Sequence, residues 1–263
     1  MNQLFAIFGN PVSHSKSPLM HNMAFETLKY NGCYTRYLLE DGGLLKDKFR
    51  SLGLSGANIT VPHKEAAFKA CDELDDFALR VGAVNTIVLK NDKLMGYNTD
   101  APGFLKCVKD FSNIKNILIL GAGGTVKSTS YILKEYGYDI DILARNKDRL
   151  KDFESDFDCF AFDNFKVKKY DLIINMTSAG LQDELLPAPK ELLEDIILNS
   201  SGAIDIIYGK QTPFLKLVKS RGIISKDGID MLINQGVLAF DYFTNHKFSL
   251  SEIENAMKKA FFV

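Results

Sequence analysis

A glycine-rich turn between an apolar strand and a helix constrains the fold more than any other feature of the chain. The apolar stretch Asn116–Leu120 runs into Gly121-Ala122-Gly123-Gly124, and Thr125–Tyr136 then has the pattern of a helix. Three further apolar stretches, IDILAR, DLIINMT and AIDIIYG, lack the strict alternation of half-exposed strands. This pattern predicts an α/β fold whose parallel sheet is covered on both faces.

The same turn indicates a ligand. Glycines let the backbone turn tightly and approach a pyrophosphate, and the free N–H groups of a helix N-terminus attract it. In the usual G-x-G-x-x-G pattern a third glycine would replace Val126, although Ser128 is small enough for helix–strand contact. We therefore predict a Rossmann-type dinucleotide-binding segment. A glycine turn in such a fold with no cofactor is the alternative.

The first hundred residues form another α/β pattern. Predicted strands are Leu4–Phe8, Tyr34–Leu39, Ala57–Val61, Val84–Leu89 and Leu94–Tyr97. A hairpin turn at Asn91-Asp92 joins the last two strands. Helices are predicted at Pro18–Tyr30, Leu44–Leu52, Lys64–Ala70 and Leu74–Val81. Two amphipathic helices follow Gly228, so the domain boundaries fall within or beside helices, near residues 101–113 and 228–236.

Composition excludes several classes of protein. The 263 residues are 46% hydrophobic and 25% charged, with a net charge of −1, which is typical of a soluble globular protein. No basic run exceeds two residues and no apolar run could span a bilayer, so we expect neither nucleic acid nor membrane as a partner. The N-terminus lacks a signal-peptide pattern, which favours the cytoplasm. The four cysteines and four histidines lack metal-site spacing, and no metal is expected.

A second short segment, FGNPVSHSKSPLMHN, crowds Ser13, His14, Ser15 and Ser17 between a strand and a helix. We expect Ser17 to cap this helix, Pro18 to take its first position and Gly32 to end it. Small hydroxyl donors beside a helix N-terminus predict a site for a small anion.

Further polar side chains follow the predicted strands, where ligand crevices of open α/β sheets lie. They are Asn58, Thr60, Lys64, Asn85, Asn98, Thr99 and Asp100. We expect several of them to converge with Ser15 and Ser17 on one cleft. Each alone also has an ordinary explanation, as a helix cap, a turn anchor or a solvated lysine.

Taken together, the motifs resemble the shikimate dehydrogenase family and its quinate-using relatives. FGNPVSHSKSPLMHN, GANITVPHKEAA, VGAVNT, GYNTDAPGF, GAGGT, NMTSAG, DIIYGKQTPFL and DGIDMLINQG occur in the order typical of that family, from residue 5 to about residue 242. The resemblance implies reversible NADPH-dependent reduction of 3-dehydroshikimate to shikimate, on the route to chorismate and the aromatic amino acids. It also implies a substrate-binding domain of residues 1–103 completed by 229–263, and a Rossmann domain of residues 104–228. The partner would be the small-molecule substrate, and the protein a monomer or homodimer.

The chemistry and the resemblance agree on roles. Hydride transfer to a ketone leaves an alkoxide, which needs a proton donor within hydrogen-bond reach. Lys64 is the candidate, and Asp100 would orient it as its catalytic partner. The resemblance places Ser15 and Ser17 at the substrate carboxylate. It assigns the remaining substrate contacts to Thr60, Asn85, Asp100, Tyr208 and Gln235.

The nucleotide contacts follow from the glycine turn and from the loop after the second Rossmann strand. In NAD enzymes an acid about 20 residues after the first glycine binds the ribose, which by counting is Asp141. Asp141 lies inside the predicted strand Asp139–Leu143, however, whereas Arg145 and Arg149 follow the strand and could meet a 2′-phosphate. We therefore expect NADP(H). Its predicted contacts are Gly121, Ala122, Gly123, Gly124, Thr125, Ala144, Arg145, Arg149, Ile206 and Gly228.

Other functions stay open at this point. One is an enzyme of the same fold that prefers quinate or NAD, and another is a paralogue that binds ligand without turnover. A hydrolase built on His14, Ser15 and Asp100 is disfavoured, because no G-x-S-x-G elbow is present and the glycine turn would have no purpose.

Overall fold

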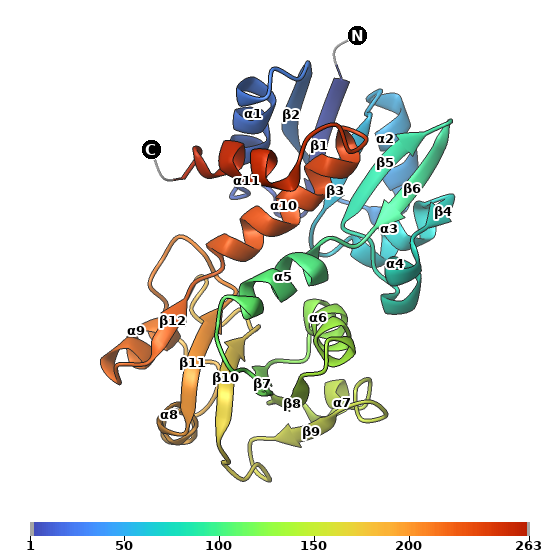
Figure 1. Ribbon diagram of the computed structural model, residues 1–263. Coiled ribbons are helices and arrows are strands. Elements are labelled where there is room, and N and C mark those ends of the chain that lie inside the picture. Colours follow the sequence, from blue (N-terminus) through green and yellow to red (C-terminus); the bar gives the residue numbers. More distant parts are fainter. Residues whose placement is uncertain (1–2, 262–263) are drawn as a thin grey trace. The chain divides into compact units, whose positions relative to one another are not determined.

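The computed structural model describes residues 3–261 (Figure 1). The chain forms two compact units. Unit 1 comprises residues 1–103 together with 232–263, and unit 2 comprises residues 104–231. Helices α5 (Asp100–Lys109) and α10 (Ile229–Phe243) each contribute residues to both units.

Unit 1 is built on a six-stranded mixed sheet in the order β2-β1-β3-β5-β6-β4. Strand β1 (Gln3–Gly9) pairs in parallel with β2 (Gly32–Leu38) and β3 (Gly56–Ile59). The antiparallel hairpin of β5 (Thr86–Lys90) and β6 (Lys93–Tyr97) extends the sheet, and β4 (Glu73–Leu74) adds a short edge. The hairpin turn falls at Asn91-Asp92 as predicted, with both residues at positive φ.

Alternation along β1 separates two layers of unit 1, since successive side chains of a strand point to opposite faces. Ala6 and Phe8 join a hydrophobic core with α2 (Leu45–Ser51), α3 (Lys64–Ala70) and α4 (Asp76–Val81). A short 3₁₀ turn, η1 (Gly42–Leu44), precedes α2. On the other face Phe5 contacts Phe25 and Phe243. Those rings lie on α1 (Ser17–Thr27) and α10, and α11 (Leu250–Lys258) packs beside α1.

Unit 2 confirms the parallel-sheet prediction. Its strands run in the order β12-β11-β10-β7-β8-β9, and all neighbours pair in parallel. Their bounds are β7 Asn116–Leu120, β8 Asp139–Ala144, β9 Asp158–Ala161, β10 Tyr170–Asn175, β11 Ser200–Asp205 and β12 Ile224–Lys226. The helices are α6 Gly124–Glu135, α7 Lys147–Leu150, α8 Lys190–Leu198 and α9 Pro213–Ser220. The strand order reverses at β7, the place where such sheets bind nucleotides.

Three expectations about α1 are wrong. Lys16 holds the N-cap position with no side-chain cap, Ser17 is already the first helical residue, and Pro18 is therefore the second. The Ser17 N–H instead donates to Ser15 Oγ at 3.2 Å, so the preceding serine satisfies it. The helix ends at Thr27, because Lys29 turns to positive φ, and Gly32 starts β2.

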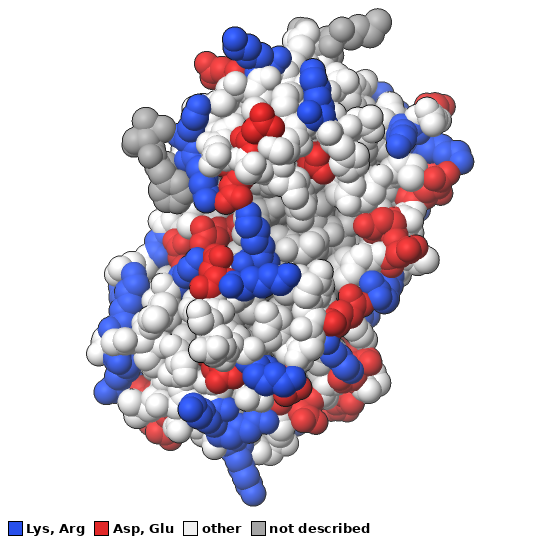
Figure 2. Space-filling view, viewed as in Figure 1, with Lys and Arg blue, Asp and Glu red and all other residues white. Residues whose placement is uncertain are grey.

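The surface carries both signs of charge. Figure 2 shows Lys and Arg side chains interspersed with Asp and Glu over the visible face. Among residues 3–261, no helix combines the length and apolarity that a bilayer span requires.

Candidate active site

Lys64 and Asp100 form an ion pair at the start of two helices of unit 1. Lys64 begins α3 beyond the end of β3, and Asp100 begins α5 after the β5–β6 hairpin. Lys64 Nζ donates to Asp100 Oδ2 at 2.5 Å, and the side chains are 20% and 12% exposed. The ammonium is therefore reachable from solvent while its carboxylate partner holds it in one direction. Such a pair can deliver or accept a proton at a bound oxygen.

A buried polar network supports the turn that carries Asp100. Asn85 precedes β5 rather than lying in it, which differs from the prediction. Its Oδ1 accepts from the Thr99 N–H at 2.7 Å, and its Nδ2 donates to Thr99 Oγ1 at 3.0 Å. Thr86 Oγ1 contacts Thr99 Oγ1 and accepts from Asn58 Nδ2 at 3.0 Å. Asn85 thus anchors the residue next to Asp100.

The remaining predicted residues of unit 1 lie in three segments. Ser15 and Ser17 are 6% and 4% exposed in the loop before α1. Thr60 directly follows β3, and its backbone N–H donates to the Phe8 carbonyl. Gln235 lies on α10, which packs closely on α5. A Cβ on Gly103 of α5 would fall 2.6 Å from the backbone nitrogen of Gln235. Glycine at residue 103 therefore permits the contact that brings Gln235 and Asp100 onto neighbouring helices.

The glycine turn of unit 2 fits a pyrophosphate. Gly121 has φ +119, a conformation that other residues rarely adopt. Cβ atoms on Gly123 or Gly124 would meet no atom within 4 Å, so the backbone there is open to an approaching group. Gly123 is the N-cap of α6 and offers no side-chain acceptor, and the first turn of α6 carries no acid. Within the described part of the chain, no side chain caps the first N–H groups of α6, which leaves them available to an anion. Ala122 and Thr125 lie in the same turn and the first turn of α6.

Asp141 is buried inside unit 2, where its carboxylate already has partners. It lies in the middle of β8 and is 6% exposed. Its Oδ2 accepts from the Tyr170 hydroxyl at 2.5 Å and pairs with Lys168 Nζ at 2.8 Å. Burial raises the pKa of Tyr170, so that phenol stays a donor. An acid held in this way is a poor candidate for binding a ribose at the strand end.

The segment after β8 presents the two predicted arginines, Arg145 in the loop and Arg149 in α7. Ala144 ends the strand, and the side chains of Arg145 and Arg149 are exposed. Neither arginine has an acidic partner in the part of the chain that the structure describes. Asp148 of α7, whose negative charge would oppose a phosphate here, pairs with Lys151 at 2.9 Å.

A buried carboxylate organises the strand ends on the other side of β7. Asp205 ends β11 and accepts from Asn175 Nδ2 at 3.1 Å, Thr212 Oγ1 at 2.5 Å and the Ile207 N–H at 3.1 Å. These bonds shape the loop that carries Ile206 and Tyr208. Burial raises the pKa of Asp205.

Gly228 packs directly against this loop. A Cβ on residue 228 would lie 2.0 Å from the Ile206 carbonyl oxygen, so only glycine fits. The structure therefore brings together Ile206 and Gly228, two of the predicted cofactor contacts.

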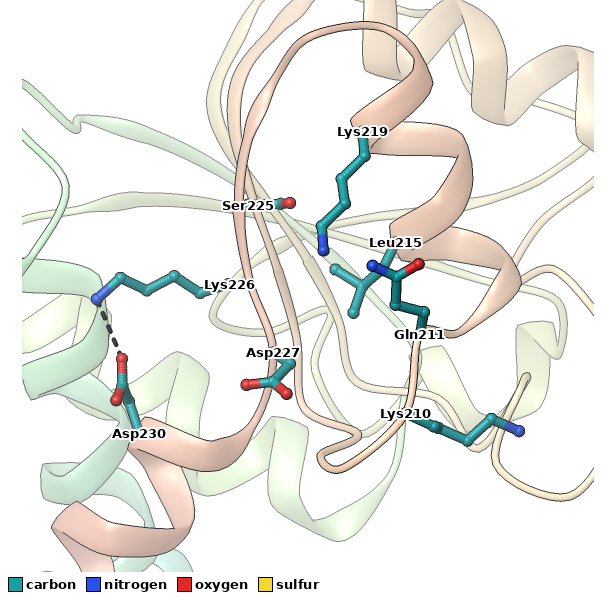
Figure 3. Close-up of a pocket in the computed structure, with 8 residues that line it drawn as sticks. All are labelled: Lys210, Gln211, Leu215, Lys219, Ser225, Lys226, Asp227 and Asp230. Carbon is teal, nitrogen blue, oxygen red and sulfur yellow. Dashed lines mark hydrogen bonds and ion pairs between the residues drawn. The ribbon is translucent and has the colours of Figure 1, made fainter. Parts of the chain in front are cut away.

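A hollow of about 490 Å³ in unit 2 contains none of the predicted residues (Figure 3). Lys219 and Gln211 point into it, whereas Lys226 extends away and pairs with Asp230 and Asp110. Its lining mixes both charges, from Lys210, Gln211, Leu215, Lys219, Ser225, Lys226, Asp227 and Asp230. Among residues 3–261, no three His, Cys, Asp or Glu side chains group as metal ligands.

Sequence reasoning missed the residues that hold the loops in place. Asn175 and Asp205 are 30 positions apart and meet only through the strand order, whereas Thr212 reaches Asp205 from the end of the loop that follows β11. Tyr34 and Arg36 of β2 contact the Ser15–Ser17 loop, and their spacing of two along a predicted strand was the available signal.

Comparison with known proteins shows which family the chain resembles. Residues 7–87 match the family model of the shikimate dehydrogenase substrate binding domain, and residues 228–258 match that of the shikimate 5′-dehydrogenase C-terminal domain. A shikimate dehydrogenase (NADP(+)) of Helicobacter hepaticus is 46% identical over 253 residues, covering 95% of this chain and 94% of the relative. The Helicobacter pylori enzyme of the same name is 44% identical over 98% of both chains.

A solved structure shares the fold. The crystal structure of shikimate 5-dehydrogenase from Thermus thermophilus, in complex with NADP(H) and shikimate, has a TM-score of 0.84 and 34% identity. The match covers 98% of this chain and 100% of that one. With relatives this similar over nearly its whole length, the chain belongs to the shikimate dehydrogenase family.

Proposed function

We propose that this protein catalyses the reversible NADPH-dependent reduction of 3-dehydroshikimate to shikimate. The observation that carries the proposal is the solvent-reachable Lys64–Asp100 ion pair, an acid–base group positioned beyond the strand ends of unit 1. Its relatives are named NADP-dependent shikimate dehydrogenases, and the Thermus thermophilus structure contains NADP(H) and shikimate. We assign residues 1–103 and 229–263 to substrate binding and residues 104–228 to nucleotide binding.

Lys64 acts as the acid in reduction. NADPH, when bound, supplies the hydride to the ketone carbon. Lys64 donates a proton to the carbonyl oxygen as negative charge develops there, and Asp100 keeps the ammonium aimed at that oxygen. In the reverse direction Lys64 accepts the hydroxyl proton of shikimate. The neighbouring Asp100 carboxylate offsets the positive charge on Lys64 in the partly buried pair.

The substrate is held by neutral donors and acceptors. Ser15 and Ser17 bind the ring carboxylate beside the N-terminus of α1. Thr60, Asn85 and Gln235 hydrogen-bond the ring hydroxyls, a task for groups that both donate and accept. Tyr208, on the loop that Asp205 shapes, completes the substrate contacts.

The nucleotide occupies the carboxyl edge of the unit 2 sheet. Residues 121–125 bind the pyrophosphate, Arg145 and Arg149 with Ala144 bind the 2′-phosphate end, and Ile206 with Gly228 complete the site. Arginine forks suit phosphate because they donate two parallel hydrogen bonds. We propose that the enzyme works in the cytoplasm as a monomer or homodimer.

The test is an activity assay with the purified protein, in which absorbance follows the formation of reduced nicotinamide nucleotide. Shikimate or quinate is combined with NADP or NAD, in all four pairings. We expect the largest kcat/KM with shikimate and NADP. A preference for quinate or NAD would identify the sibling activity of the same fold. Ligand binding by calorimetry without turnover in any pairing would identify a non-catalytic paralogue.

A further inference from the structure

Two side chains of the edge strand β2 reach the Ser15–Ser17 loop. Tyr34 and Arg36 are two residues apart, so they share one face of the strand. Arg36 donates to the Ser15 carbonyl oxygen from Nε at 3.1 Å and from Nη2 at 2.6 Å. Burial raises the pKa of the Tyr34 hydroxyl, and the neighbouring Ser17 side chain opposes that rise. One strand therefore bonds to the backbone of Ser15 and places a hydroxyl beside the side chain of Ser17.

Tyr34 is itself rigidly placed. Its ring stacks on His21 of α1 at 4.3 Å between centroids, with 7° between the planes. The Asn22 side chain makes two hydrogen bonds with the Tyr34 backbone. Its Oδ1 accepts from the Tyr34 N–H at 2.8 Å, and its Nδ2 donates to the Tyr34 carbonyl at 2.9 Å. The phenol donates to Asn58 Oδ1 at 2.7 Å, and burial raises its pKa. The Tyr34 hydroxyl, beside Ser17, is thus bonded to the network behind Asp100.

Arg36 carries a positive charge that forms no ion pair in the described part of the chain. Its side chain has no carboxylate partner among residues 3–261, and it donates two hydrogen bonds to the Ser15 carbonyl oxygen. Arg50, another exposed arginine of unit 1, also makes a double contact but pairs with the Asp92 carboxylate at 2.7 Å. The positive charge of Arg36 therefore adds to the anion-attracting field of the loop instead of being cancelled.

We propose that Arg36 and Tyr34 are positioning residues for the substrate carboxylate: Arg36 fixes Ser15 and supplies positive charge, and Tyr34 orients the Ser17 hydroxyl. This inference rests on the proposed function, since it takes a carboxylate at Ser15 and Ser17. It adds residues that would act through the loop and not on the reacting carbon. Their loss should therefore raise KM for the acid more than it lowers kcat.

The first test replaces Arg36 by Met, which keeps most of the side-chain stem, with Arg50→Met as the matched control. We expect KM for shikimate to rise roughly tenfold, as for the loss of a charge-assisted contact, with a much smaller change in kcat and in KM for NADP. Shikimate methyl ester, which has no carboxylate charge, should distinguish wild type from Arg36→Met by less than threefold. High salt should narrow the difference seen with the acid, because it screens the exposed guanidinium.

The second test replaces Tyr34 by Phe, which keeps the ring stack and removes only the hydroxyl. Tyr30→Phe is the control, because the Tyr30 hydroxyl also makes one hydrogen bond, to Gln3, and its ring packs on Phe25. If Tyr34 acts through Ser17, the effects of Tyr34→Phe and Ser17→Ala on KM should be non-additive in the double variant. Thermal unfolding of each variant separates loss of the fold from loss of binding.

The outcomes distinguish the inference from the function it rests on. Wild type without activity on shikimate overturns the proposed function. Wild type active on shikimate, with Arg36→Met equally affected on acid and ester or not affected at all, overturns the inference. Because Arg36 is exposed, this variant tests the inference even if Tyr34→Phe does not fold.

Discussion

Lys64 Nζ and Asp100 Oδ2 lie 2.5 Å apart although 36 residues separate them in the chain. Each is the first residue of its helix. A carboxylate suits that position, whereas a cation is disfavoured there by the helix dipole. The Asp100 carboxylate offsets this unfavourable placement of Lys64. A lysine that violates a local preference and is held by a distant partner is characteristic of a functional site.

Replacing Lys64 by Ala should lower kcat by roughly 10²- to 10⁴-fold, the range for losing a positioned acid–base group. Substrate affinity should change less, because the serines and amides that bind the ring remain. Steady-state kinetics with shikimate and NADP measure both. Lys69→Ala is the control, since Lys69 is an exposed residue of the same helix. A Lys64→Ala enzyme with near wild-type kcat would show that Lys64 is an ordinary surface lysine.

Gly123→Ala should separate folding from nucleotide binding. The added Cβ meets no protein atom within 4 Å, and the residue has φ −96, so the fold should tolerate it. The methyl group would occupy space beside the N–H groups of α6, and we expect KM for NADP to rise roughly tenfold or more. KM for shikimate should stay within twofold. Unchanged NADP binding would remove the turn from the nucleotide site.

Arg145→Ala should reduce kcat/KM for NADP by roughly tenfold to a hundredfold, because a phosphate–arginine contact is charge-assisted. The kcat/KM for NAD should hardly change, so the ratio of kcat/KM for NADP to that for NAD should fall. Arg221→Ala, at an exposed arginine paired with Glu194, is the control. If wild type prefers NAD, or if Arg145→Ala leaves the NADP value unaltered, the assignment of the 2′-phosphate to this loop is wrong.

His21 should make the folded state sensitive to acid. Burial lowers the pKa of His21 from 6.5 to about 3, and neither ring nitrogen has a hydrogen-bond partner among residues 3–261. Between these values the unfolded chain binds the proton and the folded chain does not, so stability rises with pH and is lost as pH falls below about 6.5. At about pH 5 the loss from this group is on the order of 2 kcal/mol.

His21→Phe tests this effect. Phenylalanine can keep the stack on Tyr34 but cannot be protonated, so the variant should lose less stability between about pH 8 and about pH 5 than wild type. Urea unfolding at the two pH values measures the difference. His14→Gln, at an exposed histidine, should behave as wild type. Parallel pH dependence in wild type and His21→Phe would assign the acid sensitivity to other groups.

The elements that local sequence defines were predicted well. The buried strand β7 and helix α3 have the predicted bounds, because an apolar run and a helix start are both encoded within a few residues. The parallel sheet of unit 2 is confirmed for the same reason. The two-residue strand β4 was missed, since only its pairing with β6 makes it a strand.

Features that depend on distant partners could not be predicted. The cap assigned to Ser17 was wrong, because the Ser15 side chain accepts the Ser17 N–H. The ties from Tyr34 and Arg36 to the loop arise only when β2 pairs with β1. Asp141 shows the converse case: its place inside a strand was readable from sequence, whereas its bond to Tyr170 required the strand order.

The two-segment make-up of unit 1 has a consequence for biosynthesis. Residues 104–231 are contiguous and can fold as soon as they leave the ribosome, as domains generally do. Residues 3–103 cannot be completed until residues 232–261 have been synthesised, because Phe240 and Phe243 of α10 cover Phe25 and Phe5. For the whole time that unit 2 is being made, the nascent chain carries an aromatic surface without its cover. A chain that ends after unit 2 would therefore expose this aromatic surface and be prone to aggregation.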